Sequence, residues 1–355
     1  MPSFNQESTA APTPARSTSQ SDTAPRVTPG PIIEATFAFA QSCALLAAVE
    51  LDLFTRIAQG KTTARALAQE AGADASALKR LLGTLHAMGF VRQTGDTYAL
   101  TPVSERFLVR TQESYMGDVA LQIRNEWDAW IHLTEVIQTG QSFRRINEEA
   151  VGGHFFAEMV DYLFHIVYPV MRRLGQRLEA GTRFHGLEVL DLGSGTAPGA
   201  IAILEQDPDA HSLAIDFPEV LARARVYAEQ HGVGERMEYR PADLEVVELP
   251  PSRFDLVFAS HTFRVLGAEI TQRLIKQSYQ TLKSEGRLVI VETYNNPDQP
   301  EQLFPRIVSL NMLVNTRSGD TFSLQQMREW VASAGFHVEV WSNIAPDPVV
   351  VATRP

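Results

Sequence analysis

The sequence predicts an α/β fold in which a seven-stranded, Rossmann-like sheet ends in an antiparallel hairpin and follows an α-rich winged-helix domain. Three observations predict this fold. From residue 187 onward, short runs rich in Val, Ile and Leu alternate with helical stretches, and a glycine-rich loop follows the first run. Near the end of the chain, two apolar runs follow each other with no helix between them. Alternating strands and helices are typical of a parallel sheet with crossover helices.

Length and composition limit the classes of protein that this chain can belong to. Its 355 residues, 44% of them hydrophobic, allow two or three domains with full cores. A net charge of −11 argues against a nucleic-acid partner. The single cysteine, Cys43, makes no disulfide framework and no thiolate metal site, so we expect a cytoplasmic protein without a metal. No apolar run approaches the roughly 20 residues that span a bilayer, and we expect no membrane partner.

The N-terminal part contains a tail and a small domain. Residues 1–30 are rich in Ser, Thr, Ala and Pro without apolar periodicity, which predicts a disordered tail. In residues 31–110, leucines recur at helical intervals, and two short strands surround the turn at 94–96. Helix, turn, helix and hairpin predict a winged helix, which can read DNA or dimerise. Only Lys79 and Arg80 are cations on the second helix, and the small apolar helix "AFAQSCALLAAVE" needs a partner surface, so we expect a homodimer.

Residues 111–180 are predicted to be mostly helical, and they form a linker with pocket helices. A stripe of Phe155, Met159, Tyr162 and His165 recurs at helical spacing. Such a stripe can be plain core or the wall of an apolar pocket, and composition does not decide between the two.

Residues 181–355 carry the predicted sheet. We expect parallel strands at 187–193, 211–217, 237–243, 254–260 and 286–292, with helices at 218–232 and 269–286. The runs at 336–343 and 347–354 predict the terminal hairpin, with one antiparallel strand.

The glycine-rich loop lies where open α/β sheets bind ligands, beyond the carboxyl end of the first strand. Its glycines are Gly193, Gly195 and Gly199, whereas a nicotinamide fingerprint would place the third at Pro198. An acid precedes the loop and would repel a pyrophosphate. Further acids end the next two strands, so three carboxylates (Asp191, Asp216 and Asp243) surround one crevice. They favour a positively charged nucleoside without phosphates, and S-adenosylmethionine is such a molecule.

With these motifs the chain resembles the small-molecule S-adenosylmethionine-dependent methyltransferases of the plant caffeic-acid and bacterial polyketide O-methyltransferase type. The resemblance runs from about residue 33 to 353. It is carried by "LEVLDLGSGTAPGAIAILEQDPDAHSLAIDFPEVLARA", "RMEYRPADL" and "TLKSEGRLVIVE". One departure is Ala197, where a third close-packed glycine is usual. The resemblance implies a winged-helix dimerisation domain, a seven-stranded methyltransferase sheet and a small-molecule acceptor.

The resemblance also assigns roles along the crevice. The methionine part of the cofactor would lie on the loop, the ribose hydroxyls on Asp216, the adenine amine on Asp243 and the adenine ring on Leu244. Ser260 stands where the family often has a lysine, so that contact would be weaker or absent. The complete cofactor set comprises Asp191, Gly193, Ser194, Gly195, Asp216, Phe217, Asp243, Leu244 and Ser260. The acceptor pocket would be lined by Phe155, Met159, Tyr162, Tyr294 and Met312.

The family's catalytic histidine is replaced in this chain. Family members place a histidine base, followed by Asp-Trp, just after the fourth strand, and Arg264 stands at that position here. An arginine stays protonated and cannot act as a general base. Of the two glutamates that support the histidine, one matches Glu292 and the other falls at Thr321. His261 lies three residues before Arg264, would share a face with it in a helix, and could replace the base.

Several chemistries remain open at this stage. An anionic acceptor would suit Arg264, and O-methylation could use His261 or an acceptor that is already ionised. S-methylation of a thioether acid, as in dimethylsulfoniopropionate synthesis, and C-methylation of an activated ring, as in bacteriochlorophyll-type enzymes, need no such base. Two rivals from other classes are a winged-helix regulator that senses the cofactor and an enzyme that holds the cofactor without transferring methyl.

Overall fold

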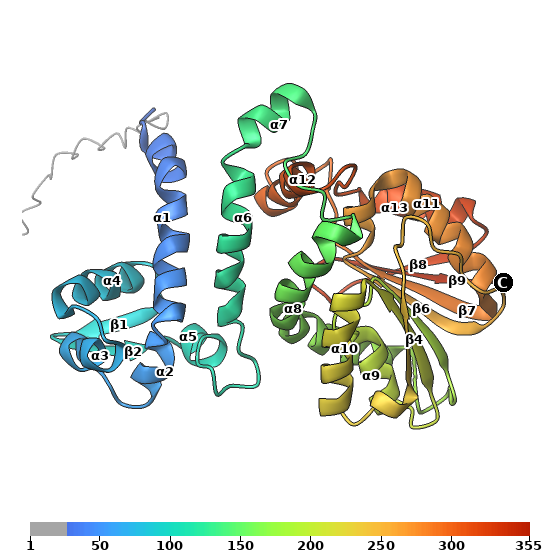
Figure 1. Ribbon diagram of the computed structural model, residues 1–355, viewed down its shortest axis with the longest axis horizontal. Coiled ribbons are helices and arrows are strands. Elements are labelled where there is room, and N and C mark those ends of the chain that lie inside the picture. The colour runs from blue at the N-terminus through green and yellow to red at the C-terminus, as the bar shows by residue number, and fades with distance from the viewer. Residues whose placement is uncertain (1–26) are drawn as a thin grey trace, which may run out of the picture.

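The computed structural model describes residues 27–355. The predicted disordered tail therefore lies outside the described residues up to position 26. The chain forms an N-terminal helical unit, a set of central helices and a C-terminal α/β unit (Figure 1).

The N-terminal unit has the order of elements that the sequence predicts. Gly72 ends α3 in a left-handed conformation, and Asp74 caps α4 by accepting a hydrogen bond from the amide of Ala77. The hairpin is confirmed, with Val91 paired to Leu100 and Thr94 to Thr97. The elements are α1 (Gly30–Glu50), α2 (Leu53–Ala58), α3 (Ala64–Ala71), α4 (Ala75–Ala87), β1 (Val91–Thr94), β2 (Thr97–Leu100) and α5 (Pro102–Phe107).

Helix α1 leaves an apolar face uncovered in the single chain. Ile32 is 72% exposed, Phe37 61% and Phe39 52%. By length and composition alone, this helix could cross a membrane. The expectation that no apolar run approaches the length of a bilayer span is therefore wrong. The reason is that Thr, Gln, Ser and Cys interrupt the apolar residues without adding a charge between positions 35 and 49.

The central helices connect the two units. They are η1 (Gly117–Leu121), α6 (Gln122–Trp130), α7 (Leu133–Thr139) and the long α8 (Glu149–Arg177). Helix α6 runs beside α1, where the rings of Phe39 and Trp127 lie 5.8 Å apart between centroids (Figure 1). Helix α8 packs on α9 and continues through Pro169. Its inward-facing side chains Phe164, Val167, Val170, Met171 and Leu174 belong to the core on one face of the sheet.

The C-terminal unit is a seven-stranded sheet in the order β5-β4-β3-β6-β7-β9-β8. All pairs are parallel except those of β9, which is antiparallel to both β7 and β8. The five predicted parallel strands and the terminal hairpin are thus confirmed. The strands are β3 (Glu188–Leu192), β4 (His211–Asp216), β5 (Met237–Pro241), β6 (Phe254–Ser260), β7 (Leu282–Val291), β8 (His337–Trp341) and β9 (Val349–Thr353).

Helices cover both faces of this sheet (Figure 1). Side chains alternate along β3, so Val189 joins the core with α8, α9 and α10, while Leu190 and Leu192 join the core with α11 and α13. The helices are α9 (Pro198–Gln206), α10 (Pro218–Gln230), α11 (Phe263–Thr281), α12 (Leu303–Asn315) and α13 (Leu324–Ser333). Helix α11 begins earlier than predicted, and Gly267 breaks it with a φ of 80°.

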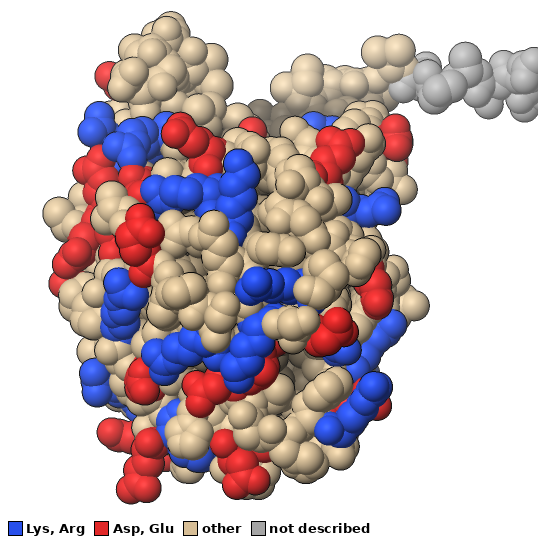
Figure 2. All heavy atoms as spheres, turned by 90° about the vertical axis from the view of Figure 1, so that its right-hand side faces the viewer, with Lys and Arg blue, Asp and Glu red and all other residues tan. Residues whose placement is uncertain are grey.

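The side of the α/β unit that lies at the right of Figure 1 carries scattered charges of both signs. Figure 2 shows lysines and arginines interspersed with aspartates and glutamates on this face. The chain reverses its strand order between β3 and β6, so the carboxyl ends of these two strands form the edge where such sheets bind ligands.

Candidate functional site

The glycine loop after β3 has a backbone that requires small residues. Gly193 and Gly195 have φ values of 63° and 57°, in the left-handed region that favours glycine. A Cβ on Gly193 would lie 2.6 Å from the Cγ2 of Thr262, closer than real contacts allow. The hydroxyl of Thr262 donates a hydrogen bond of 3.0 Å to the carbonyl of Leu192. This contact holds the loop against the carboxyl end of β6. Ala197, where the resemblance expects a glycine, also has a left-handed φ of 57°.

Two acids lie at the carboxyl ends of β3 and β4, beside this loop. The buried Asp191 accepts a hydrogen bond of 3.1 Å from the amide of Ala200. Asp216 accepts one from the amide of Gly195 at 2.9 Å and one from that of Phe217 at 2.8 Å. Burial raises the pKa of Asp191 to about 7 and that of Asp216 to about 6, against the opposing effect of these amides. Each carboxyl keeps lone pairs for further donors.

Polar groups of this crevice fit a nucleoside with a positive charge. The buried hydroxyls of Ser194 and Ser260 have no hydrogen-bond partner among residues 27–355. The Asp243 carboxylate accepts the amide of Glu245 at 2.7 Å, which fixes the turn that presents the buried Leu244. The unpartnered hydroxyls suit the polar groups of a ribose. The carboxyls of Asp191 and Asp216 suit a cation and ribose hydroxyls, and the apolar Leu244 suits an adenine ring. Within the described residues, no group of three or more His, Cys, Asp or Glu could hold a metal ion.

One cavity brings most of the predicted site residues together. It comprises about 1230 Å³ of space between atoms, its open mouth included. All nine predicted cofactor residues line it, and so do His261 and Arg264 of the predicted catalytic group. Of the predicted acceptor residues, Phe155, Met159 and Met312 line it as well. Tyr162 and Tyr294 are buried without a partner for their hydroxyls in the described part of the chain, and neither lines the cavity. Burial raises the pKa of both tyrosines well above the ordinary value.

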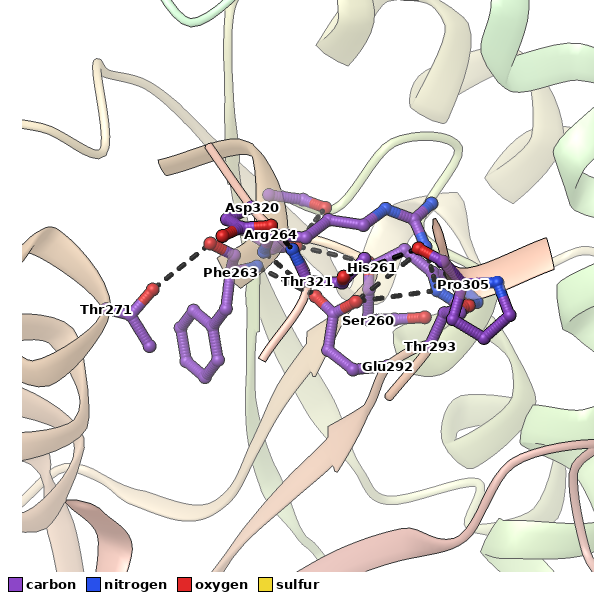
Figure 3. A network of polar contacts seen from close by, with 12 residues as sticks. Ser260, His261, Phe263, Arg264, Thr271, Glu292, Thr293, Pro305, Asp320 and Thr321 are labelled. Atoms are coloured by element: carbon purple, nitrogen blue, oxygen red, sulfur yellow. Dashed lines mark hydrogen bonds and ion pairs between the residues drawn. The ribbon is translucent and has the colours of Figure 1, made fainter. Parts of the chain in front are cut away.

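Arg264 and His261 contact each other at the cavity wall, after β6 (Figure 3). Arg264 Nη1 lies 3.0 Å from His261 Nδ1. A guanidinium has no acceptor, so Nδ1 accepts this hydrogen bond. The neutral ring then carries its proton on Nε2. His261 does not lie on a helical face with Arg264, because its φ of 55° places it outside α11. The left-handed turn, and not helical spacing, brings the two side chains together.

Glu292, at the end of β7, supports the same corner. Its Oε1 accepts the amide of Phe263 at 2.9 Å and the amide of Arg264 at 3.3 Å, at the start of α11 (Figure 3). Its Oε2 lies 3.7 Å from Arg264 Nη1 and 3.9 Å from His261 Nδ1. Burial opposes ionisation of Glu292, but His261 and Arg264 outweigh it and lower its pKa. Glu292 is therefore a buried carboxylate that positions Arg264 and His261.

Two further residues bear on the acids of this corner. Thr321 has no carboxylate to replace the second glutamate. Its hydroxyl donates a hydrogen bond to the carbonyl of Pro305 at 3.4 Å. Asp347, in the loop before β9, was not singled out from the sequence. Burial raises the pKa of Asp347, the charge of Glu292 raises it further, and the charge of Arg264 lowers it. The corner thus holds a cation, a histidine and two acids.

Sequence reasoning also missed a polar wall of the cavity formed by Gln122, Glu126 and Asn311. Glu126 lies on α6 and Asn311 on α12. The signal that could have found this wall is the spacing of Asn311 and Asn315, two amides four residues apart in a mostly apolar helix.

Comparison with known sequence families gives two matches along the chain. Residues 33–110 match the O-methyltransferase dimerisation domain, and residues 130–337 match the O-methyltransferase domain. The second match alone covers more than half of the chain.

Two curated relatives are similar over nearly their whole length. The chain is 26% identical to the tetracenomycin polyketide synthesis 8-O-methyl transferase TcmO of Streptomyces glaucescens, over 92% of this chain and 97% of the relative. It is 24% identical to the N,N-dimethyltransferase OxyT of Streptomyces rimosus, over 91% and 96%.

A solved structure shares the fold. It is that of an O-methyltransferase-type protein from Nostoc punctiforme, with a TM-score of 0.84 and 23% identity. The similarity covers 92% of this chain and 99% of that chain.

Proposed function

This chain belongs to the O-methyltransferase family that has an N-terminal dimerisation domain and uses S-adenosylmethionine, and from this premise we propose which acceptor it methylates and how. The protein is a small-molecule methyltransferase. We propose that its acceptor is a flat aromatic molecule whose reacting oxygen reaches the site already ionised. The observation that carries this proposal is the hydrogen bond between Arg264 and His261.

The loop after β3 and the acids beside it would hold the cofactor. Asp216 would accept the ribose hydroxyls with its remaining lone pairs, and Asp191 would lie near the positively charged part. The unpartnered hydroxyls of Ser194 and Ser260 support this assignment, because a buried hydroxyl without a partner is costly. When bound, S-adenosylmethionine supplies an electrophilic methyl group on a sulfonium.

Of the four groups at the corner, Asp347 does not line the cavity, and the other three are not suited to remove a proton from the acceptor. Arg264 is a cation, and Glu292 has a lowered pKa. His261 uses its Nδ1 lone pair to accept from Arg264, so its Nε2 carries the proton. Such a corner donates hydrogen bonds and attracts an anion. The acceptor would lose its proton to solvent before it binds, and its oxyanion would then form the new carbon–oxygen bond as the carbon–sulfur bond breaks.

Proximity and alignment would supply the catalysis in this arrangement. Phe155, Met159 and Met312 give the cavity apolar surfaces on which a flat ring can pack. Arg264 and His261 would direct the oxyanion toward the methyl group, and holding two reactants in line can contribute several kcal/mol.

Nitrogen is a second candidate for the reacting atom. The relative OxyT is named an N,N-dimethyltransferase. An amine already has an available lone pair, so it too needs no general base. The guanidinium of Arg264, which lines the cavity while Glu292 does not, favours the oxyanion over the amine, because it would repel an ammonium group that has yet to lose its proton.

The pH dependence of kcat/KM for two acceptors of different acidity tests this proposal. Suitable probes are naphthalene-1,5-diol and its more acidic 4-chloro derivative, with S-adenosylhomocysteine as the measured product. If the acceptor must arrive ionised, the rise of kcat/KM with pH shifts to lower pH for the chloro compound, in step with its own acidity. A rise at the same pH for both acceptors would identify a base on the enzyme and contradict the proposal.

A further inference from the structure

Glu126 forms a second polar region in the same cavity, on the inner side of α6. The residue is only 9% exposed. Its Oε2 accepts a hydrogen bond of 2.7 Å from Asn315 Nδ2. Its Oε1 has two longer contacts, each of 3.4 Å, with Asn311 Nδ2 and Gln122 Nε2. Residues of α6 and α12 thus hold one buried acid in place.

The hydrogen-bond partners of Glu126 are neutral amides. Asn311 is fixed in orientation, because its Oδ1 accepts from Trp130 Nε1 at 3.1 Å and from Asn315 Nδ2 at 2.8 Å. Its Nδ2 therefore turns toward Glu126. A carboxylate oxygen can accept two hydrogen bonds at about 2.7–3.0 Å, and contacts of 3.4 Å are weak. Oε1 of Glu126 can therefore accept a shorter and stronger hydrogen bond from another donor.

Glu126, whose Oε1 can accept a further hydrogen bond, lines the cavity in which the acceptor would bind. Glu126, Gln122 and Asn311 line the same space as Arg264 and His261. Met159 of α8 and Met312 of α12 line the same space. The cavity therefore has a hydrogen-bond-donating corner at Arg264 and His261, after β6, and an acidic wall on α6 and α12.

We propose that Glu126 determines acceptor specificity by accepting a hydrogen bond from a second polar group of the acceptor. This inference rests on the proposed function. The acceptor is then a flat aromatic molecule with the reacting oxygen at Arg264 and His261 and with a hydroxyl or amine donor at Glu126. A buried group that lacks its hydrogen-bond partner is costly, so an acceptor without the donor is disfavoured.

Matched naphthol probes test this role. Naphthalene-1,5-diol and 5-amino-1-naphthol carry a second donor, whereas 5-methoxy-1-naphthol has an oxygen at that place without a proton. Binding of each probe to the protein saturated with S-adenosylhomocysteine is measured by calorimetry, and kcat/KM with S-adenosylmethionine is measured in parallel. We expect the wild type to bind the diol and the amine at least about tenfold tighter than the methoxy compound. Comparing the diol with the amine shows which donor the site takes.

Variants separate Glu126 from the rest of the cavity. Glu126→Gln replaces the carboxylate by an amide. The ratio of the affinity for donor-bearing probes to the affinity for the methoxy compound should then fall to about one or below. Glu126→Asp keeps the charge but withdraws the oxygens by one methylene, and it should lower the preference partly. Affinity for S-adenosylhomocysteine should stay within about twofold, which reports a folded cofactor site. Glu158→Gln, the same change at an exposed position of α8, should leave the preference unchanged.

The outcomes for the inference and for the proposed function can be told apart. If the probes are methylated but Glu126→Gln and Glu126→Asp leave the preference unchanged, Glu126 is a structural acid and the inference is overturned. Equal binding of the diol and the methoxy compound by the wild type also overturns it. If donor-bearing probes bind in a Glu126-dependent way but no S-adenosylhomocysteine forms, the inference stands and the proposed acceptor chemistry fails.

Discussion

The Nη1 of Arg264 lies 3.0 Å from the Nδ1 of His261, and this hydrogen bond fixes which ring nitrogen carries the proton. A general base needs a free lone pair directed at the acceptor, and this contact uses the lone pair of Nδ1. The two side chains instead offer protons to whatever enters the corner.

Arg264→Ala should raise the KM for an ionised acceptor by about ten- to a hundredfold, because a hydrogen bond to a charged group is worth about 1.5–3 kcal/mol. Affinity for S-adenosylhomocysteine should not change. Arg264→Lys keeps the charge but loses the planar fork, and it should still impair acceptor binding. Steady-state kinetics and calorimetry check these points. Normal turnover by Arg264→Ala would show that this arginine is only a packing residue.

His261→Ala should lower kcat by less than about tenfold, whereas removal of a general base costs about 10²–10⁴. The pH profile of the variant should keep the shape of the wild-type profile. Single-turnover kinetics with a naphthol acceptor measure the chemical step directly. A loss of a thousandfold or more, together with loss of the rise with pH, would return the role of base to His261.

The affinity for S-adenosylmethionine should increase with pH through the range in which Asp191 and Asp216 ionise. Burial raises their pKa values to about 7 and about 6. A cationic ligand favours the ionised forms, so the dissociation constant should be about tenfold or more lower at pH 8 than at pH 5.5. Asp191→Asn should flatten this dependence. Calorimetry in buffers of different ionisation enthalpy should detect protons released on binding at pH 6, and their absence would contradict the assignment.

The same shifts predict how the unliganded protein responds to pH. The folded-state pKa values lie above the ordinary value of 3.8, so the folded state binds more protons than the unfolded state between these values. The stability contributed by Asp191 and Asp216 is complete below pH 3.8 and is lost as the pH rises through about 6 and 7. Relative to the wild type, Asp191→Asn should therefore gain thermal stability more at pH 8 than at pH 5. Equal gains at both values would refute the raised pKa.

Asp216→Ala should weaken binding of S-adenosylhomocysteine by about 1–3 kcal/mol, because ribose hydroxyls would lose their acceptors in a partly buried site. Asp209→Ala, a change at an exposed aspartate just before β4, is the control and should bind normally. Calorimetry at pH 8 makes the comparison. An unchanged affinity in Asp216→Ala would place the ribose elsewhere.

Charges on the uncovered face of α1 should separate the subunits of the dimer. Ile32 and Phe37 are 72% and 61% exposed in the single chain, so Ile32→Asp with Phe37→Asp should not disturb its own fold. The dimer should weaken by about 30-fold or more. Val246→Asp, at a residue 72% exposed on the α/β unit, serves as control. Sedimentation velocity at several concentrations measures the effect, and an unchanged dimer would exclude this face from the interface.

The sheet could be predicted from the sequence because each buried parallel strand is a short, continuous apolar run. The run from Phe254 to Ser260 is a strand with the predicted bounds. The terminal hairpin was predictable for a similar reason, since two apolar runs without a helix between them can pair only as neighbours. Helix α11 was harder, because Gly267 interrupts its periodicity and the sequence places its start too late.

The geometry of the site could be predicted only in part. The acids Asp191 and Asp216 end recognisable strands, so their convergence followed from the fold. The contact between His261 and Arg264 depends on a left-handed residue that is not a glycine, and sequence spacing gives no sign of it. The grouping of Glu126 with Asn311 joins residues far apart in the chain, on helices whose packing the sequence does not specify.

The uncovered face of α1 also has a consequence for how the protein is made. Synthesis begins at the N-terminus, so α1 leaves the ribosome before any strand of the large sheet exists. Its apolar side chains then meet water, chaperones or the same helix of a chain growing on a neighbouring ribosome. Pairing of two nascent chains would shield these side chains early. The yield of active enzyme should therefore depend on how densely its messenger RNA is translated, as well as on the sequence of the catalytic unit.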